Sequence, residues 1–154
     1  MKPLTLHTVK RWTQLALAFA PVAMGGCVAF EPSDIPAGAL PLEAPAHFRQ
    51  WWAQTEQCSG LTGPMDVIRW YVVPDVSSFE TDIGEKVGLW IKTPTDVAIV
   101  LAEPYADHEL VVRHEMLHQL LQRSGHPAEY FVDKCGLTWE RWHDGTPILA
   151  ISST

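Results

Sequence analysis

The chain has 154 residues, of which 47% are apolar and 19% are charged, so we expect one small domain with its own core and exclude a chain that is disordered throughout. The 18 acidic residues outnumber the 11 basic ones. Nucleic-acid binding needs clustered Lys and Arg, so we expect no nucleic-acid partner. Outside the N-terminus, no apolar run reaches the about 18 residues that a membrane-spanning helix requires.

Residues 1–26 have the composition of an export signal. Three basic residues precede the apolar stretch Leu15–Met24, and small residues follow, which is the pattern of a secretory signal peptide. Met24-Gly25-Gly26-Cys27 resembles the lipobox of bacterial lipoproteins, whose cysteine receives lipid and becomes the mature N-terminus. The resemblance implies that a lipid on Cys27 is the sole membrane attachment. Because Val28 rather than Asp follows, it also implies sorting to the periplasmic face of the outer membrane. Plain secretion and an uncleaved anchor are the alternatives.

The segment 27–46 is rich in Pro and Ala and predicts a semi-extended tether, which leaves 47–154 as the folded domain. An exported protein meets an oxidising compartment, and with Cys27 lipidated two cysteines remain. Cys58 and Cys135 are therefore a candidate disulfide, with two separately buried thiols as the competing interpretation.

Periodicity predicts the elements of the domain in chain order. The first is a helix at 47–57 that ends at Ser59-Gly60. Runs rich in β-branched and aromatic residues then predict strands at 66–73, 87–92 and 96–102.

A long helix is predicted over 107–123, with Asp107 as its N-cap and Gly125 at the left-handed C-terminal position. Pro127 suits the first position of a further helix at 127–134. The order of helix, strands, helix and helix predicts an α+β fold in which a three-stranded or slightly larger sheet packs on the long helix.

His114-Glu115-Met116-Leu117-His118 matches the pattern HExxH. Residues four apart on a helix lie on one face, so both imidazoles can reach one Zn²⁺ at about 2.0–2.1 Å. Glu115 projects about 100° around the helix from His114, where its carboxylate can accept a proton from a water that the metal polarises. We therefore predict a zinc site with Glu115 as the catalytic base.

The HExxH pattern does not say which residue is the third metal ligand. His126 is favoured because it follows Gly125, where the chain reverses toward the preceding turns. Glu129, with Asp133 one turn later, is the rival. The remaining candidates are His143, Glu140 and His108.

The stretch VVRHEMLHQLL resembles the extended signature of the zincin metallopeptidases, in which the intervening positions carry no charge. Leu121 and Ser124 stand where metzincins have Gly and His, which excludes that class. The segment 125–131 (GHPAEYF) resembles the ligand-bearing segment of SprT-like and related minimal zinc proteases, or minigluzincins. This resemblance implies a zincin-like fold with His126 as the third ligand.

The resemblance also implies that the strand at 96–102 is the sheet edge beside the cleft and pairs with an extended peptide. Transition-state stabilisation asks for a donor near the developing oxyanion, and the candidates by residue type are Tyr130, Tyr105 and His143.

Together these observations predict a zinc-dependent metallopeptidase of the bacterial cell envelope that hydrolyses a peptide or protein substrate. A zinc-stabilised binding module without catalysis, and hydrolysis of a non-protein amide such as a cell-wall cross-link, are the rival interpretations.

Overall fold

The computed structural model describes residues 35–143 and 146–147. The expected signal peptide, Cys27 and the first part of the expected tether lie outside these residues. No helix within the described part of the chain is both long and apolar enough to cross a membrane.

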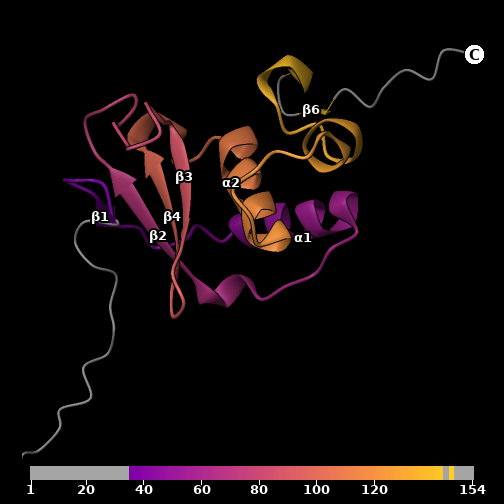
Figure 1. The fold of residues 1–154 in the computed structure, drawn as a ribbon, viewed down its shortest axis with the longest axis horizontal. Helices are drawn as coiled ribbons and strands as arrows, with labels where there is room; N and C mark the ends of the chain where they lie inside the picture. The colour runs from indigo at the N-terminus through magenta and orange to yellow at the C-terminus, as the bar shows by residue number, and fades with distance from the viewer. Residues whose placement is uncertain (1–34, 144–145, 148–154) are drawn as a thin grey trace, which may run out of the picture.

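A mixed four-stranded sheet forms one side of the domain (Figure 1). Its strands are β1 (Leu40–Pro41), β2 (Ile68–Val73), β3 (Gly88–Lys92) and β4 (Val97–Ala102), in the spatial order β1-β2-β4-β3. β2 and β4 are parallel, whereas the β1–β2 and β3–β4 pairs are antiparallel. The predicted α+β class is therefore confirmed, with one strand more than the three predicted from the sequence.

β4 is one of the two inner strands, between β2 and β3, and all six of its residues are buried. The prediction that this strand forms the edge beside the cleft is wrong. Its continuous apolar run reflects a neighbouring strand on each side and cover on both faces. β3 is the edge strand instead.

The folded domain begins before His47. β1 lies in the segment assigned to the tether, and it pairs with β2. The backbone N–H of Leu42 also donates to the carbonyl of Trp70 at 2.9 Å. Leu42 and Ala44 pack against the main core, so the polypeptide is already fixed to the sheet at Leu40.

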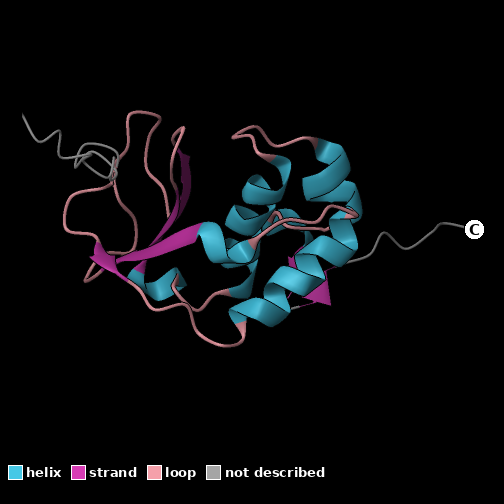
Figure 2. Cartoon of the chain, turned by 90° about the horizontal axis from the view of Figure 1, so that it is seen from below, coloured by secondary structure: helices cyan, strands magenta, loops and turns pink. Residues whose placement is uncertain are grey.

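The helices gather on one side of the sheet (Figures 1 and 2). The two longest are α1 (Phe48–Ser59) and α2 (Glu109–Leu121), which pack against each other. A six-residue π-helix, η3 (Glu129–Lys134), follows α2. Short 3₁₀ turns and a two-stranded pair complete the described chain: η1 (Met65–Val67), η2 (Glu103–Tyr105), η4 (Trp139–Arg141), β5 (Trp142–His143) and β6 (Thr146–Pro147).

The main core lies between α1, α2 and the sheet. Aromatic and branched side chains from all three fill it, including Phe48, Trp52, Trp70, Ile99 and Met116. Nine of the thirteen residues of α2 are buried, so this helix runs through the interior rather than along the surface.

α2 is shorter at both ends than predicted. It begins after His108, and Asp107 pairs with His47 Nε2 at 2.6 Å instead of capping the helix. It ends at Leu121, and Gln122 takes the left-handed conformation (φ 55°) expected of Gly125. The early end turns the chain back while it is still beside the last turn of α2.

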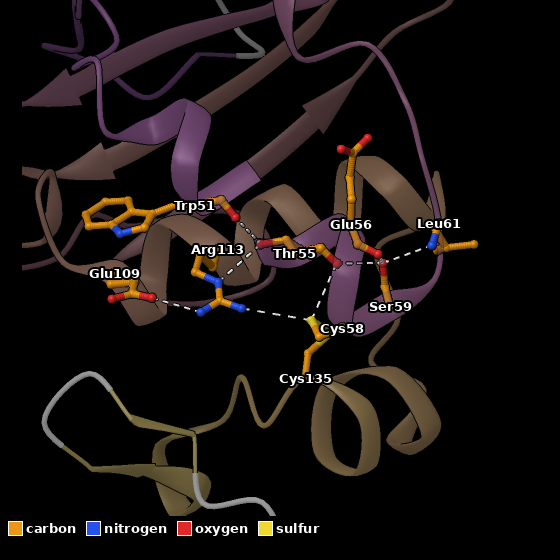
Figure 3. Close-up of a disulfide and its surroundings, with 9 residues drawn as sticks. All are labelled: Trp51, Thr55, Glu56, Cys58, Ser59, Leu61, Glu109, Arg113 and Cys135. Atoms are coloured by element: carbon orange, nitrogen blue, oxygen red, sulfur yellow. Dashed lines mark hydrogen bonds and ion pairs between the residues drawn. A yellow bond between two sulfur atoms is a disulfide. The ribbon is translucent and has the colours of Figure 1, made fainter. Parts of the chain in front are cut away.

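The sulfur atoms of Cys58 and Cys135 lie 1.96 Å apart and join the end of α1 to the residue that follows η3 (Figure 3). The guanidinium of Arg113, which is 4% exposed, lies beside this bridge. It donates to Glu109 Oε1 at 2.8 Å and to Thr55 Oγ1 at 3.2 Å. The buried charge is therefore paired, and α2 is tied to α1 at the point where the disulfide anchors η3.

We expect the purified domain to contain no free thiol at Cys58 or Cys135, and the double variant Cys58→Ser/Cys135→Ser to unfold at lower temperature. Closure of a loop of this length restricts the unfolded chain by about 4–5 kcal/mol in the entropy model. Thiol counting under denaturing conditions and thermal unfolding with and without reductant measure both effects. Two reactive thiols in oxidised protein would contradict the bridge, and the double variant should show no response to reductant.

Candidate metal centre

Three histidine rings meet at one point beside α2. His114 and His118 come from successive turns of the helix, and His126 comes from the loop that follows it. His126 Nε2 lies 3.0 Å from His114 Nε2 and 3.2 Å from His118 Nε2. The structure thus brings together the three residues predicted as metal ligands.

Backbone carbonyls orient the two helix-borne rings. His114 Nδ1 donates to the carbonyl of Leu137 at 2.9 Å, and His118 Nδ1 donates to the carbonyl of Arg123 at 2.9 Å. A carbonyl oxygen can only accept, so each Nδ1 carries the proton and each Nε2 presents a bare lone pair. The early end of α2 matters here, because it places the Arg123 carbonyl within reach of His118.

The rings are neutral at neutral pH. Desolvation by burial lowers the pKa of His114 to about 4, while its bond to Leu137 raises the pKa and the neighbouring His126 lowers it. Burial likewise lowers the pKa of His118 to about 4 and lowers the pKa of His126. Neutral imidazole is the form that binds a metal, so the cluster needs no deprotonation to act as a ligand set.

Two of the three nitrogen separations fit a tetrahedral ion, and all three ligand nitrogens lie within 4.8 Å of one another. Ligand nitrogens at about 2.0–2.1 Å from such an ion lie about 3.3–3.4 Å from one another. The two separations of 3.0 and 3.2 Å are close to that value. With both Nδ1 protons given to carbonyls, His114 and His118 cannot donate to His126, so one N–H of His126 can satisfy only one of them, whereas a cation would accept all three nitrogens.

Phe131 lies against all three rings. Its ring centroid is 4.7 Å from that of His114 and 4.9 Å from those of His118 and His126. Phe131 is 1% exposed and belongs to η3, whose end carries Cys135. An apolar wall therefore fixes the imidazoles from the side that the disulfide anchors.

Glu115 is 6% exposed and lies between α2 and the edge strand β3. Desolvation by burial raises the pKa of its carboxyl to about 8, whereas the backbone N–H of Trp90 and the ammonium of Lys86 lower it. A bound dication would favour the ionised form in the same way as Lys86 does, only more strongly. The carboxyl is thus buried beside the histidines, and burial raises its proton affinity above that of an exposed glutamate.

A cavity of about 480 Å³ contains the three histidines and Glu115 in its wall. One side is formed by β3 and by residues of the segment 83–87 before it, and the other by residues 137–140 after η3. Ile83 and Trp139, which are 72% and 57% exposed, belong to its lining from these two sides. A ligand held in this cavity would contact both the histidine cluster and Glu115.

None of the other candidate ligands whose side chains are described belongs to the cluster. Glu129 is exposed and pairs with Lys134 at 2.8 Å, so it does not join the cluster. His108 packs against Tyr105 and Trp139. Glu140 lines the cavity, but the metal-ligand cluster found among the described residues contains only the three histidines. The side chain of His143 lies outside what the structure describes.

Two of the three candidate oxyanion donors, Tyr130 and Tyr105, do not line the cavity, and the side chain of the third, His143, is not described. Tyr130 packs against the ammonium of Lys134 at 4.4 Å, and Tyr105 packs against Trp139. Neither is among the residues that line the cavity. Sequence reasoning did not anticipate Lys86, which is the one lysine or arginine among the described residues of the lining. No local pattern in the sequence shows that a residue in the loop before β3 will reach the cavity.

No protein-family model, curated protein or solved structure matches this chain. The site must therefore be interpreted from its own geometry.

We expect His126→Ala to lose most of its bound metal and Glu129→Ala to keep it. The first substitution removes one of three converging nitrogens, whereas the second removes only an exposed ion pair with Lys134. Metal content after dialysis against a zinc buffer, measured by mass spectrometry, compares the two variants with wild type. Retention of metal by His126→Ala together with its loss from Glu129→Ala would reverse the assignment.

Proposed function

We propose that the protein is a zinc-dependent metallopeptidase that hydrolyses peptide bonds with Glu115 as its general base. The observation that carries this proposal is the convergence of three neutral imidazoles beside one buried carboxyl in the wall of one cavity. Catalytic zinc sites use three protein ligands and leave a further position open, whereas structural sites use four.

Zinc is the metal that the donor set favours. Imidazole nitrogen suits Zn²⁺ and other late transition ions, while Ca²⁺ and Mg²⁺ prefer oxygen. His114, His118 and His126 would hold the ion, and the carbonyls of Leu137 and Arg123 would keep two of the rings in the required tautomer. When bound, the ion supplies a Lewis acid that polarises a carbonyl and lowers the pKa of water.

Glu115 moves the proton. Its carboxylate accepts a proton from the attacking water and later donates it to the leaving amine nitrogen, which must be protonated to depart. The backbone N–H of Trp90 holds the carboxylate in place between α2 and β3, and burial raises its affinity for the proton that it must accept. Lys86 contributes positive charge to the same region.

The arrangement of the elements supports a zincin-like domain of minimal size. An HExxH helix lies beside a mixed sheet, and the edge strand β3 runs along the cavity. An extended peptide or protein segment is the substrate that such a site accommodates.

We further propose that the chain is an exported bacterial lipoprotein held at the envelope by a lipid on Cys27. The motif at 24–27 and the preceding apolar stretch support this, and a disulfide suits an oxidising compartment.

Cys27→Ser should abolish membrane attachment and leave the domain folded, because the packed part of the chain starts at Leu40 or before it. Fractionation of bacteria that express the full chain, with metabolic labelling by a palmitate analogue, measures this. Label on the Cys27→Ser variant, or its equal recovery in the membrane fraction, would contradict the anchor.

Glu115→Gln should retain zinc but lose at least about a thousandfold in kcat, because it removes the base without touching a ligand. Hydrolysis of a mixed decapeptide library, followed by mass spectrometry, measures activity. Glu129→Gln is the matched control and should behave as wild type, since Glu129 is exposed and outside the cavity lining. Full activity of Glu115→Gln would refute the assignment, and no hydrolysis by zinc-loaded wild type would favour a binding module.

A further inference from the structure

Strand β3 turns its free backbone edge toward α2. The N–H of Ala102 donates to the carbonyl of Val87 at 2.9 Å, so the backbone of Val87 faces β4. Backbone direction alternates along an antiparallel strand, so the N–H and C=O groups of Gly88 and Trp90 point away from β4. The hydrogen bond from the Trp90 N–H to the Glu115 carboxyl agrees with this parity.

Side-chain contacts also hold β3 against α2. Trp90 Nε1 donates to Gln119 Oε1 at 2.9 Å, and the Trp90 ring stacks near that of His118 with centroids 6.1 Å apart. Lys92 Nζ donates to Gln122 at the end of the helix. The strand is thus fixed along the length of α2 by alternate residues.

Gly88 is the point of closest approach. A Cβ atom at this position would lie 2.8 Å from both Glu115 Oε1 and Val111 Cγ1, and 3.1 Å from Glu115 Cγ. Real Cβ contacts are essentially never so short, and Val111 is a β-branched residue with little rotamer freedom on a helix. The carboxyl of Glu115 therefore occupies the space that a side chain at position 88 would take.

We propose that Gly88 is a positioning residue for the reaction: its missing side chain creates the space in which the Glu115 carboxyl is held between β3 and α2. This inference rests on the proposed function of Glu115. The metal ligands do not share this support, because His114 and His118 are oriented by the carbonyls of Leu137 and Arg123. Gly88 therefore affects the position of Glu115, whereas the carbonyls of Leu137 and Arg123 orient the two ligand rings on the same helix.

The test compares Gly88→Ala with Gly63→Ala. A Cβ at Gly63 would also meet α2, but at 3.4 Å from Leu120 Cδ2 and with no atom of Glu115 within 4 Å, so it is a matched control. For Gly88→Ala we expect kcat to fall about ten- to a hundredfold. KM and zinc affinity should stay within about threefold of wild type, since no ligand moves.

A second substitution separates displacement of Glu115 from general damage. Val111→Ala in the Gly88→Ala background removes one of the two closest contacts and should restore part of the lost kcat. Wild-type kcat in Gly88→Ala would overturn the inference. So would loss of zinc in that variant together with lost activity, because Gly88 would then support the whole site.

A readout independent of activity is a thermal-unfolding cycle on the metal-free protein. Gly88→Ala should lower Tm more in the wild-type background than in Glu115→Ala, where the clashing carboxyl is gone, whereas Gly63→Ala should have the same effect in both. Equal losses for Gly88→Ala in the two backgrounds would overturn the inference. If wild type hydrolyses no peptide, the proposed function fails, and this cycle still decides whether Gly88 makes the space for Glu115.

Discussion

Two backbone carbonyls decide which ring nitrogens face the cavity. Leu137 and Arg123 each accept a proton from an Nδ1, which leaves the opposite nitrogen of His114 and His118 without one. Two bare lone pairs close together beside a third imidazole are unfavourable without a cation, and a protein tolerates this only where the surrounding structure holds the rings. The rest of the domain holds these rings in place.

The support comes from segments distant in sequence. α2 provides two rings from a buried helix, and η3 provides Phe131 against all three. The Cys58–Cys135 bridge ties η3 to α1, while the paired guanidinium of Arg113 ties α1 to α2. A change at the bridge therefore reaches the imidazoles through one aromatic side chain and through the carbonyl of Leu137, which follows Cys135 by two residues.

Local patterns revealed much of this fold and site. The first helix, the three long strands and the HExxH helix lie within about two residues of where periodicity placed them. His126 meets its partners because the chain reverses after α2, as predicted, although the left-handed residue is Gln122 rather than Gly125. What failed were statements about long-range pairing. An apolar run such as β4 does not say which strand lies beside it, and β1 is too short and too proline-rich to resemble a strand. Gly88 gave no signal at all, since a glycine in a strand does not reveal which side chain will fill its space.

The pairing of β1 with β2 has a consequence for where the protein can act. Thirteen residues, from Val28 to Leu40, separate the proposed lipid attachment from the first residue fixed to the sheet. A chain of that length extends at most about 45 Å at roughly 3.3–3.6 Å per residue. A lipid at Cys27 would thus hold the domain close to the bilayer, and only polypeptides near the membrane surface would reach its cavity.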